Sequence, residues 1–563
     1  MSASLSKKRH FYWEAALSPS AQGMGLKLAF LLFLCSLPAI LSQENNDVTI
    51  IVKGSVTEAE TDDNFVCATL DWWPPEKCNY KQCPWGKSSI FNLDLNHPYL
   101  VRAIEAFRPL RIRVGGSLQD QIKYGIGSLK FSCDPFTKMS GGLFGFSKGC
   151  LSIARWDALN LLFQKTGAIV TFGLNALYGR HQVQKGFWQG AWNSSNARDF
   201  IEYTISKGYP VDSWEFGNEL SGRGVLARVD AEQYGKDLIS LKAILDELYK
   251  KSRSKPLLVA PGGFFDNQQW YAKLLEVSGP SVLNAMSHHV YNLGPGNDPR
   301  IVSKITDPKS LSWFADTFRN VQLTIQRHGP WSSAWVGEAG GAYNSGSRLV
   351  SNTFLNSFWY LDQLGMASKY NTKVYCRQTL IGGNYGLLDT QTFIPNPDYY
   401  SALLWHRLMG KGVLSVDISG SPFLRAYAHC RKQKSGVTML LINLSKSAAF
   451  TVTVRNDLNV DLAEGNGIQK DSSFIHGLKQ TVSWIGKEAS LDSHKREEYH
   501  LTAKDGNHLS RIMLLNGIPL QLNKNGEIPA LNPLLVSVSS PIFIAPLSIA
   551  FVAFPNFEAR ACA

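Results

Sequence analysis

The chain has 563 residues, too many for one small hydrophobic core, so its length predicts a large domain joined to a smaller one. With 44% hydrophobic and 18% charged residues and no long block of one charge, the composition is that of a globular protein and excludes a largely disordered chain. The 15 tryptophans suit carbohydrate binding, because sugar faces stack on indole rings, and they equally suit a large aromatic core.

The first 42 residues are predicted to be an N-terminal extension followed by a secretory signal peptide. The apolar run Leu28–Leu41 follows Lys27 and precedes the polar stretch SQENND, and its 14 residues are too few to span a bilayer. A buried helix is the other interpretation of this run, and the start codon, Met1 or Met24, stays open. We expect a secreted protein of the extracellular space, the cell wall or a vacuole, with a peripheral membrane association left open.

The net charge indicates the kind of partner. Cleavage near Ser42 lowers the charge from +12 to +9, and a basic secreted protein attracts anionic partners. Because no nucleic-acid-binding motif is present, an acidic glycan is favoured over nucleic acid, although solubility alone also explains the charge.

The cysteines predict disulfides. Cleavage leaves eight of the nine, and an even number in a secreted chain favours disulfides over a metal site. Cys78 and Cys83 form no CxxC motif and no histidine pair follows at zinc-ligand spacing, so we predict no metal. Cys376 lies inside an apolar run and is predicted to be a buried free thiol. Two sequons predict N-glycosylation at Asn193 and Asn443.

Residues 64–412 alternate apolar, β-branched runs with amphipathic helical segments such as 230–251 and 352–370. Eight strands separated by helices predict a (β/α)8 barrel. A doubly wound sheet is the alternative, but it requires an early Gly-rich phosphate turn that this sequence lacks. The predicted strands cover residues 64–73, 111–117, 168–177, 211–219, 256–263, 282–291, 334–341 and 373–383.

Residues 413–563 change to strands without helices, which predicts a β-sandwich domain. The strands are FLRAYAHCRK, GVTMLLINLS, AFTVTVRN, RIMLLNGIPLQL and PLSIAFVAF. Prolines interrupt the last apolar stretch, so we interpret it as a strand and not as a lipid-anchor signal. The stretch VTIIVKG, within residues 43–63, precedes the barrel and is predicted to pair with the sandwich.

Polar residues end six of the predicted barrel strands, where a barrel of this kind presents its reactive groups. Glu219 and Glu338 end the fourth and seventh strands, and two carboxyls about 5–5.5 Å apart are what retaining glycoside hydrolysis requires. For either glutamate alone, a solvated loop or an ion pair is the simpler explanation. Glu215 lies in mid-strand and is predicted to be a buried structural partner. Near the two glutamates, Asn218 is expected to hold a sugar 2-hydroxyl, and three glycines to make room for the ring; the other strand-end groups are Asp71, Asn175, His288, His289, Tyr291, Asn384 and Tyr385.

The motifs WEFGNE, WVGEAGGAYNSG, FGLNAL, HHVYNLG and GGNYGLLD resemble those of the heparanase family, glycoside hydrolase family 79, over essentially the whole chain after the signal. The run WWPPEKCNYKQCPWG is similar to the plant heparanase-like members, whose relatives include plant β-glucuronidases. The resemblance implies that Glu219 is the general acid/base, that Glu338 is the nucleophile, and that Cys430 and Cys562 form a disulfide. It also implies substrate contacts at Asp71, Asn218, Tyr291 and Tyr385, to which the strand-end position adds His289, and at the backbone of Asn344 and Ser345, where animal heparanase has glycines.

The family pattern also sets the expected function. The stretch 117–150 is short and carries two cysteines, which predicts a single-chain, monomeric enzyme without the internal excision of animal heparanase. Obvious Lys/Arg clusters for heparan sulfate are absent, which favours glucuronic acid on an arabinogalactan, another acidic cell-wall polysaccharide or a small glucuronide. We therefore predict a secreted retaining glycoside hydrolase that needs no cofactor. A glycan-binding pseudo-enzyme, a transglycosylase and an endo-acting heparanase-type enzyme remain alternatives, and endo or exo cleavage stays open.

Overall fold

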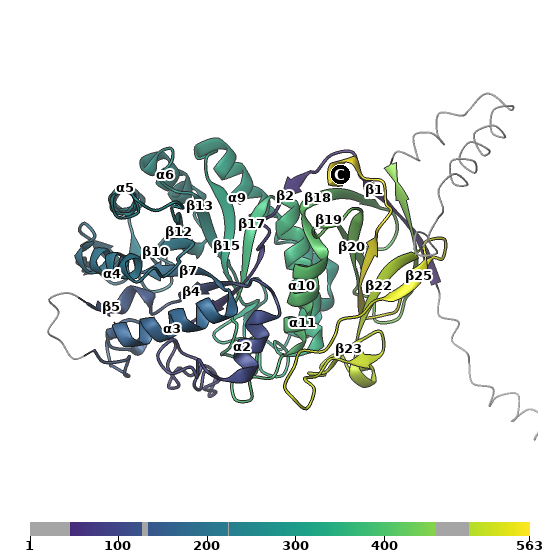
Figure 1. Cartoon of the computed structure of the whole chain (residues 1–563), viewed down its shortest axis with the longest axis horizontal. Coiled ribbons are helices and arrows are strands. Elements are labelled where there is room, and N and C mark those ends of the chain that lie inside the picture. Colours follow the sequence, from purple (N-terminus) through teal and green to yellow (C-terminus); the bar gives the residue numbers. More distant parts are fainter. Residues whose placement is uncertain (1–44, 127–132, 223, 458–494) are drawn as a thin grey trace, which may run out of the picture. The chain divides into compact units, whose positions relative to one another are not determined.

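The computed structural model describes residues 45–126, 133–222, 224–457 and 495–563, so the predicted signal peptide lies outside the described residues. Its larger domain is a closed barrel of eight parallel strands that neighbour one another in chain order, and the last pairs with the first (Figure 1). This confirms the predicted (β/α)8 barrel and its eight strands. They are β3 (Val66–Leu70), β4 (Arg111–Val114), β7 (Ile169–Leu174), β10 (Ser213–Phe216), β12 (Leu257–Phe264), β13 (Ala285–Val290), β15 (Ser333–Ala339) and β17 (Thr372–Arg377).

Helices follow the strands and cover the barrel, and their ends carry the expected caps. The Asp230 side chain accepts from the Glu232 N–H at the start of α5, and Gly167 ends α3 in a left-handed conformation at φ 67°. The α-helices of the described residues are α2 (Pro98–Glu105), α3 (Ile153–Thr166), α4 (Ser195–Ser206), α5 (Ala231–Leu248), α6 (Gln268–Ser278), α7 (Ile301–Thr306), α8 (Pro308–Ser312), α9 (Ala315–His328), α10 (Phe354–Lys369) and α11 (Pro397–Leu408).

Two short strand pairs and one three-stranded sheet lie in the loops of the barrel. β5 and β6 run side by side next to the Cys133–Cys150 disulfide, and β14 pairs with β16 beside the loop that follows Glu338. These accessory strands are β5 (Ile122–Gly125), β6 (Gly149–Ser152), β8 (His181–Gln184), β9 (Phe187–Gln189), β11 (Arg228–Val229), β14 (Gly294–Pro295) and β16 (Ala342–Tyr343).

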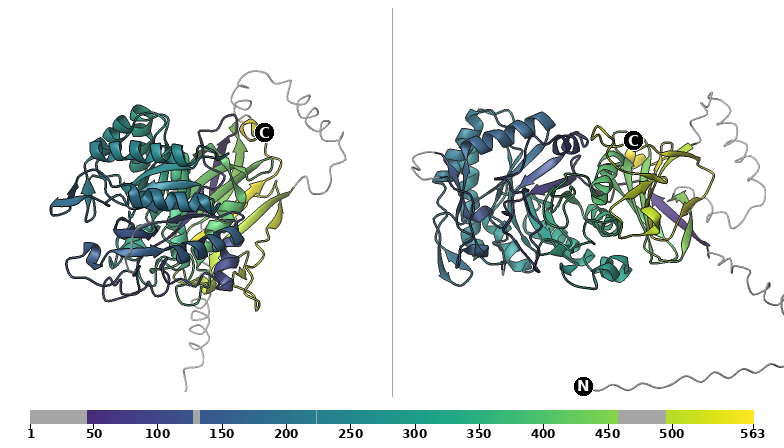
Figure 2. Two further views of the ribbon diagram at one scale, coloured as in Figure 1. Left: turned by 60° about the vertical axis from the view of Figure 1, so that its left-hand side comes forward. Right: turned by 90° about the horizontal axis from the view of Figure 1, so that it is seen from below.

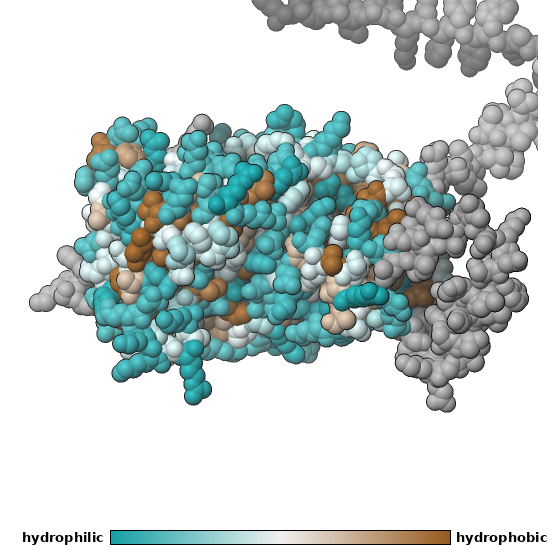
Figure 3. Space-filling view, turned by 90° about the horizontal axis from the view of Figure 1, so that it is seen from above, coloured by the Kyte–Doolittle hydropathy of each residue, from teal (hydrophilic) through white to brown (hydrophobic). Residues whose placement is uncertain are grey.

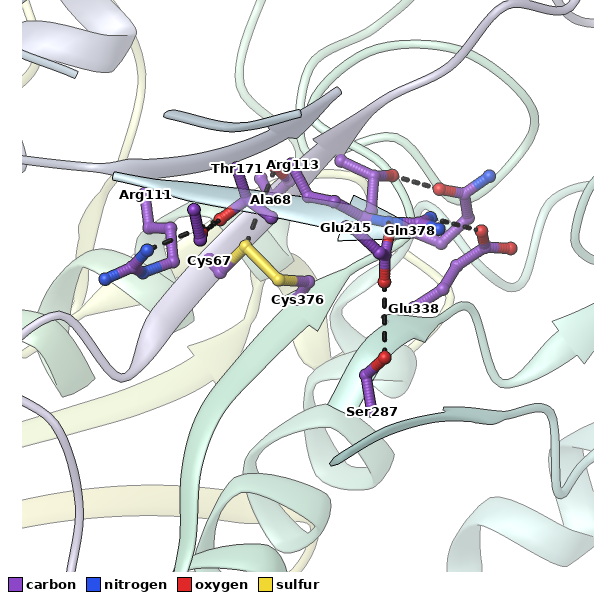
Figure 4. The surroundings of a disulfide bond; sticks show 12 residues. Cys67, Ala68, Arg111, Arg113, Thr171, Glu215, Ser287, Glu338, Cys376 and Gln378 are labelled. Carbon is purple, nitrogen blue, oxygen red and sulfur yellow. Dashed lines mark hydrogen bonds and ion pairs between the residues drawn. A yellow bond between two sulfur atoms is a disulfide. The ribbon is translucent and has the colours of Figure 1, made fainter. Parts of the chain in front are cut away.

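A small apolar cluster that includes Val259, Ala285, Trp335 and Val374 contains the two sulfurs of a disulfide between Cys67 and Cys376. The two cysteines are register partners on β3 and β17, so this bond joins the first and last strands of the barrel (Figure 4). The prediction that Cys376 is a free thiol is therefore wrong, because barrel closure makes these strands neighbours.

The smaller domain is rich in strands and forms one 12-stranded sheet whose two halves are joined through β18 (Met409–Ile418). Alternate side chains of its strands pack into a separate apolar core, as in a sandwich. Its other strands are β1 (Asn45–Lys53), β2 (Ala59–Glu60), β19 (Leu424–Arg431), β20 (Val437–Asn443), β21 (Ala449–Asn456), β22 (Lys495–Ala503), β23 (Met513–Leu515), β24 (Ile518–Pro519), β25 (Leu534–Ser537), β26 (Ile542–Ile544) and β27 (Ser548–Phe554).

Two covalent or pairing features tie the chain ends to this sheet. β1, purple in Figure 2, is antiparallel to β18 and parallel to β21, although it precedes the barrel in the chain. Cys430 on β19 is bonded to Cys562, which confirms the disulfide implied by the family resemblance. Both ends of the described chain are thereby fixed to the smaller domain.

The two sequons have different surroundings. Asn193 is exposed, and N-glycosylation there stays a prediction. Asn443 is fully buried, and its Nδ2 donates to the carbonyls of Ala448, Ile544 and Ala545 at 2.8–3.2 Å. A glycan on that nitrogen has no room in this fold, so the prediction of glycosylation at Asn443 is wrong for the folded chain.

The surface carries little continuous apolar area on the face drawn in Figure 3, where small brown patches are scattered over a hydrophilic surface. Among the described residues, none of the helices is long and apolar enough to cross a membrane.

Candidate active site

A pocket of about 600 Å³ opens where the barrel strands end, and both predicted catalytic glutamates line it. It also brings together four of the predicted substrate contacts. Three others, Asp71, Asn218 and His289, lie just behind its wall and are buried. The lining residues are Trp73, Lys77, Ser117, Gly142, Phe144, Gly145, Glu219, Val225, Leu226, Phe264, Tyr291, Glu338, Tyr343, Asn344, Ser345, Gln378 and Tyr385.

The backbone at Gly217–Glu219 turns the chain out of β10 and into the pocket. Gly217 and Glu219 both have positive φ, 72° and 56°, and for glutamate that left-handed conformation is strained. Hydrogen bonds hold it in place: the Asn218 N–H donates to Asp120 at 2.8 Å, and the Glu219 N–H donates to the Gly262 carbonyl at 2.7 Å. Gly217, Asn218 and Glu219 thus follow the end of β10, where the backbone leaves the barrel wall and the Glu219 carboxyl enters the pocket.

The Glu219 carboxyl is in an environment that favours its neutral form. It is buried, and its Oε1 lies 3.0 Å from His289 Nδ1. Burial raises the pKa of Glu219 to about 7, although the positive charge of Arg113 opposes the shift. Burial also lowers the pKa of His289 to about 4, so this imidazole is neutral near pH 7 and supplies a hydrogen bond without a charge.

The Glu338 carboxylate is held by a cation and a hydroxyl. Arg113 Nη1 donates to its Oε2 at 2.8 Å, and the Tyr291 hydroxyl donates to its Oε1. Along β15, a register shift opposite His288 and His289 leaves Gly337 as an extra residue, and such a bulge re-aims the side chain that follows. These contacts fix the position of both carboxylate oxygens at the pocket.

Arg113 joins the groups that surround the site, and the sequence analysis missed it. Its guanidinium donates to Glu215 at 2.6 Å and to Glu338 at 2.8 Å (Figure 4). It also donates to Asn218 Oδ1 at 2.8 Å. Glu215 is buried in this ion pair, as its mid-strand position predicted. The available signal was the alternation in RIRV, which places Arg111 and Arg113 on one side of β4, inside the barrel.

Asp71 is surrounded by donors beneath the pocket. Its Oδ1 accepts from the Trp72 and Trp73 N–H groups, and its Oδ2 accepts from Gln378 Nε2 at 2.7 Å. Burial and the nearby charge of Glu338 raise the pKa of Asp71 to about 7. Gln378, which sequence reasoning also missed, lines the pocket where Asp71 does not.

The glycines around Glu338 have a different role from the predicted one. A side chain at Gly340 would meet the Tyr291 ring at 2.6 Å and the Tyr385 ring at 3.1 Å, and one at Gly337 would meet Glu215 at 3.2 Å. Gly341 has φ 70° and faces Leu293 and Trp359. The prediction that these glycines admit a sugar ring is wrong, because they admit the protein's own side chains.

One oxygen of Glu219, one oxygen of Glu338 and one ring nitrogen of His289 lie within 4.8 Å of one another. That set could ligate a metal ion, but the Arg113 guanidinium already occupies Glu338 and would repel a cation beside it. The arrangement fits a carboxyl pair with one member paired to an arginine better than it fits a metal centre.

Comparisons with known proteins agree with this geometry. Residues 47–365 match the family model described as "Glycosyl hydrolase family 79, N-terminal domain". The chain is 59% identical to heparanase-like protein 2 of Arabidopsis thaliana, over 95% of this chain and 99% of that protein. It is 40% identical to baicalin-β-D-glucuronidase of Scutellaria baicalensis, over 93% and 94% of the two chains.

Among solved structures, a 4-O-α-L-rhamnosyl-β-D-glucuronidase from Fusarium oxysporum superposes with a TM-score of 0.60 at 14% identity, over 90% of this chain and all of that one. This likeness shows a shared fold. The family model and the sequence relatives show more: the chain is a glycoside hydrolase and belongs to glycosyl hydrolase family 79.

Proposed function

We propose that this chain is a secreted retaining hydrolase that releases β-linked glucuronic acid from an acidic plant glycan or a small glucuronide. The observation that carries the proposal is the carboxyl pair: oxygens of Glu219 and Glu338 lie within 4.8 Å of each other. Retaining glycosidases hold their carboxyls about 5–5.5 Å apart, whereas inverting enzymes need roughly 6.5–9.5 Å to admit a water.

In the first step Glu338 attacks the anomeric carbon while Glu219 protonates the departing oxygen. The pKa of Glu219, raised to about 7 by burial, keeps it protonated for this step at mildly acidic pH. Before the second step, the Glu338 carboxylate has lost its negative charge by forming a covalent ester with the sugar. Glu219 then takes a proton from water, which displaces the sugar with its configuration retained.

We assign two groups to hold the sugar. Arg113 donates a hydrogen bond to Asn218 Oδ1 and so orients the amide. The Asn218 Nδ2 has no hydrogen-bond partner among the described residues. This donor suits the sugar 2-hydroxyl, whose hydrogen bond strengthens in the transition state. We assign the glucuronate carboxylate to the backbone of Asn344 and Ser345, which line the pocket, and the 40% identity to a baicalin-β-D-glucuronidase supports a glucuronide substrate.

The test is release of 4-nitrophenol from its β-D-glucuronide by wild type, Glu219→Gln, Glu338→Gln and the exposed control Glu232→Gln. Glu338→Gln is expected to lose turnover by about 10³-fold or more. Because 4-nitrophenol leaves readily without protonation, Glu219→Gln is expected to show a burst of one equivalent followed by slow turnover. Glu232→Gln should match wild type.

Proton NMR of the first sugar released reports its anomeric configuration. A β-anomer supports retention, and an α-anomer would overturn the assigned mechanism. Binding without turnover in wild type would favour a glycan-binding pseudo-enzyme, and transfer to added sugar in place of water would favour a transglycosylase.

A further inference from the structure

The loop from Trp73 to Trp85 follows β3 and borders the pocket; we refer to it as the cysteine loop. Its tip is a tight turn, in which Asn79 and Gln82 exchange backbone hydrogen bonds of 2.8 and 2.9 Å. The two residues at the turn, Tyr80 and Lys81, both have positive φ, which is unusual for such side chains. The Cys78–Cys83 disulfide spans the base of the turn and holds this conformation.

The cysteine loop holds the pocket wall at Asn344 and Ser345. The Ser345 hydroxyl accepts from Trp85 Nε1 at 2.9 Å and donates to Asn79 Oδ1 at 2.9 Å. Asn344 Nδ2 donates to the Tyr80 hydroxyl at 2.9 Å. These bonds matter because Asn344 and Ser345 have φ of 59° and 72°, a conformation that glycine adopts freely and other residues adopt only when held.

The same contacts explain how side chains stand where the heparanase pattern has glycines. Both side chains are used to fasten the backbone, and neither backbone N–H has a hydrogen-bond acceptor among the described residues. The two N–H groups of a pocket-lining segment are thus left available for a ligand.

The cysteine loop also carries a cation into the pocket. The Lys77 ammonium lies 4.0 Å from the centroid of the Trp73 ring, and the side chain is half-buried in the pocket wall. No described residue offers it a carboxylate within ion-pair distance. A half-buried ammonium without such a partner favours binding an anion, and the rings of Trp73 and Trp85, 6.4 Å apart, connect it to the Asn344–Ser345 wall.

We propose that the cysteine loop makes the site selective for an acidic sugar, with Lys77 pairing with the carboxylate of the reacting unit and Asn79, Tyr80 and Trp85 holding the Asn344–Ser345 backbone against it. The inference rests on the proposed function and deepens it. Lys77 is a specificity residue, whereas Asn79, Tyr80 and Trp85 are positioning residues.

The test compares wild type, Lys77→Met and Lys81→Met on 4-nitrophenyl β-D-glucuronide and 4-nitrophenyl β-D-glucoside. Lys81 is exposed in the same loop and lines no part of the pocket. Lys81→Met therefore serves as the control, because it removes the same charge outside the pocket. Lys77→Met is expected to lower kcat/KM for the glucuronide about tenfold to a hundredfold, mostly through KM, and to change the glucoside by less than about twofold. Lys81→Met should leave both substrates unchanged.

An equal loss on both substrates would overturn the proposal, because Lys77 would then support the site without selecting the acidic sugar. An unchanged ratio of glucuronide to glucoside turnover would also overturn it. The positioning part is tested by Asn79→Ala and by Cys78→Ser with Cys83→Ser, in which the same ratio is expected to fall while circular dichroism stays native. A ratio that stays at the wild-type value in these variants would remove the role of the loop.

The two proposals fail in distinguishable ways. If wild type hydrolyses neither substrate, the proposed hydrolysis fails. Calorimetric titration with free D-glucuronic acid then still measures whether Lys77 of the cysteine loop contributes to binding the acidic sugar. Weaker binding to Lys77→Met than to Lys81→Met supports the assignment of Lys77, and equal binding overturns it.

Discussion

Glu219 combines a strained backbone, a buried carboxyl and a neutral histidine partner. The residue is 7% exposed, and its φ of 56° is maintained by the hydrogen bond from its N–H to the Gly262 carbonyl. Such strain persists only where the surrounding structure fixes the backbone, as the hydrogen bonds from the Asn218 and Glu219 N–H groups do here. Because the Glu219 carboxyl is buried, ionising it lowers the free energy of unfolding, and this loss can be measured.

The sign of that effect follows from the two pKa values. Glu219 titrates near 4.5 when unfolded and at about 7 when folded, so the folded state binds the proton more tightly. The protonated Glu219 carboxyl therefore contributes fully to the free energy of unfolding below about pH 4.5. This contribution is lost as pH rises through about 7, and the free energy of unfolding falls by on the order of 3 kcal/mol.

We expect Glu219→Gln to be more stable than wild type by that amount at pH 8 and to differ little at pH 4.5. Urea unfolding of both proteins at the two pH values measures it. Asp71 and Asp120, whose pKa values burial also raises to about 7, are present in both proteins and cancel. A stability difference that is the same at both pH values would contradict the assignment of the raised pKa to Glu219.

At the scale of strands, one arginine links three elements. Arg113 on β4 reaches Glu215 on β10 and Glu338 on β15, so one guanidinium forms ion pairs with two buried carboxylates from separate strands. Removing one partner of a buried ion pair leaves an uncompensated charge, which costs about 3–5 kcal/mol.

Arg113→Met is expected to destabilise the protein by that amount and to abolish turnover. Adding Glu215→Gln should restore part of the stability and none of the activity, because Glu338 still lacks its cation. Arg111→Met is the matched control: this interior arginine of the same strand pairs with Asp212, which is partly exposed, and its loss should leave turnover near wild type. Urea unfolding and steady-state kinetics on the four proteins measure both effects, and recovery of activity in the double variant would contradict the role given to Arg113.

The barrel strands could be predicted because parallel strands buried on both faces read as continuous apolar runs between helices. β18 was missed because it follows α11 directly, with no loop between the helix and the strand. The alternation in RIRV could have placed Arg113 inside the barrel, but its carboxylate partners Glu215 and Glu338 lie 102 and 225 residues away, and no local pattern reveals those pairings. Cys376 could have been assigned, because the predicted barrel already makes its last strand the neighbour of the first, where Cys67 lies.

At the scale of the molecule, α10 joins the two domains. Asp362 on this helix is fully buried and accepts from Arg425 and Tyr427 of β19. A side chain at Gly365 would meet the Tyr427 ring at 2.4 Å, so the close approach of this ring requires glycine. The start of the helix is held by hydrogen bonds from Phe354 and Leu355 to the carbonyls of Ser510 and His508. These contacts account for a helix that is buried on nearly every side, with 15 of its residues inaccessible.

The disulfide between Cys67 and Cys376 turns the barrel into a covalent ring. The bond spans 309 positions of the chain, so every barrel loop from α2 to α10 lies inside the ring. A protease that nicks the chain once in any of these loops opens the ring and releases no fragment. Limited digestion should therefore give one full-length band on a non-reducing denaturing gel and two bands after reduction, and two bands without reductant would show that the ring is not closed. Internal cleavage of this enzyme would then cut the backbone and leave a single covalent molecule.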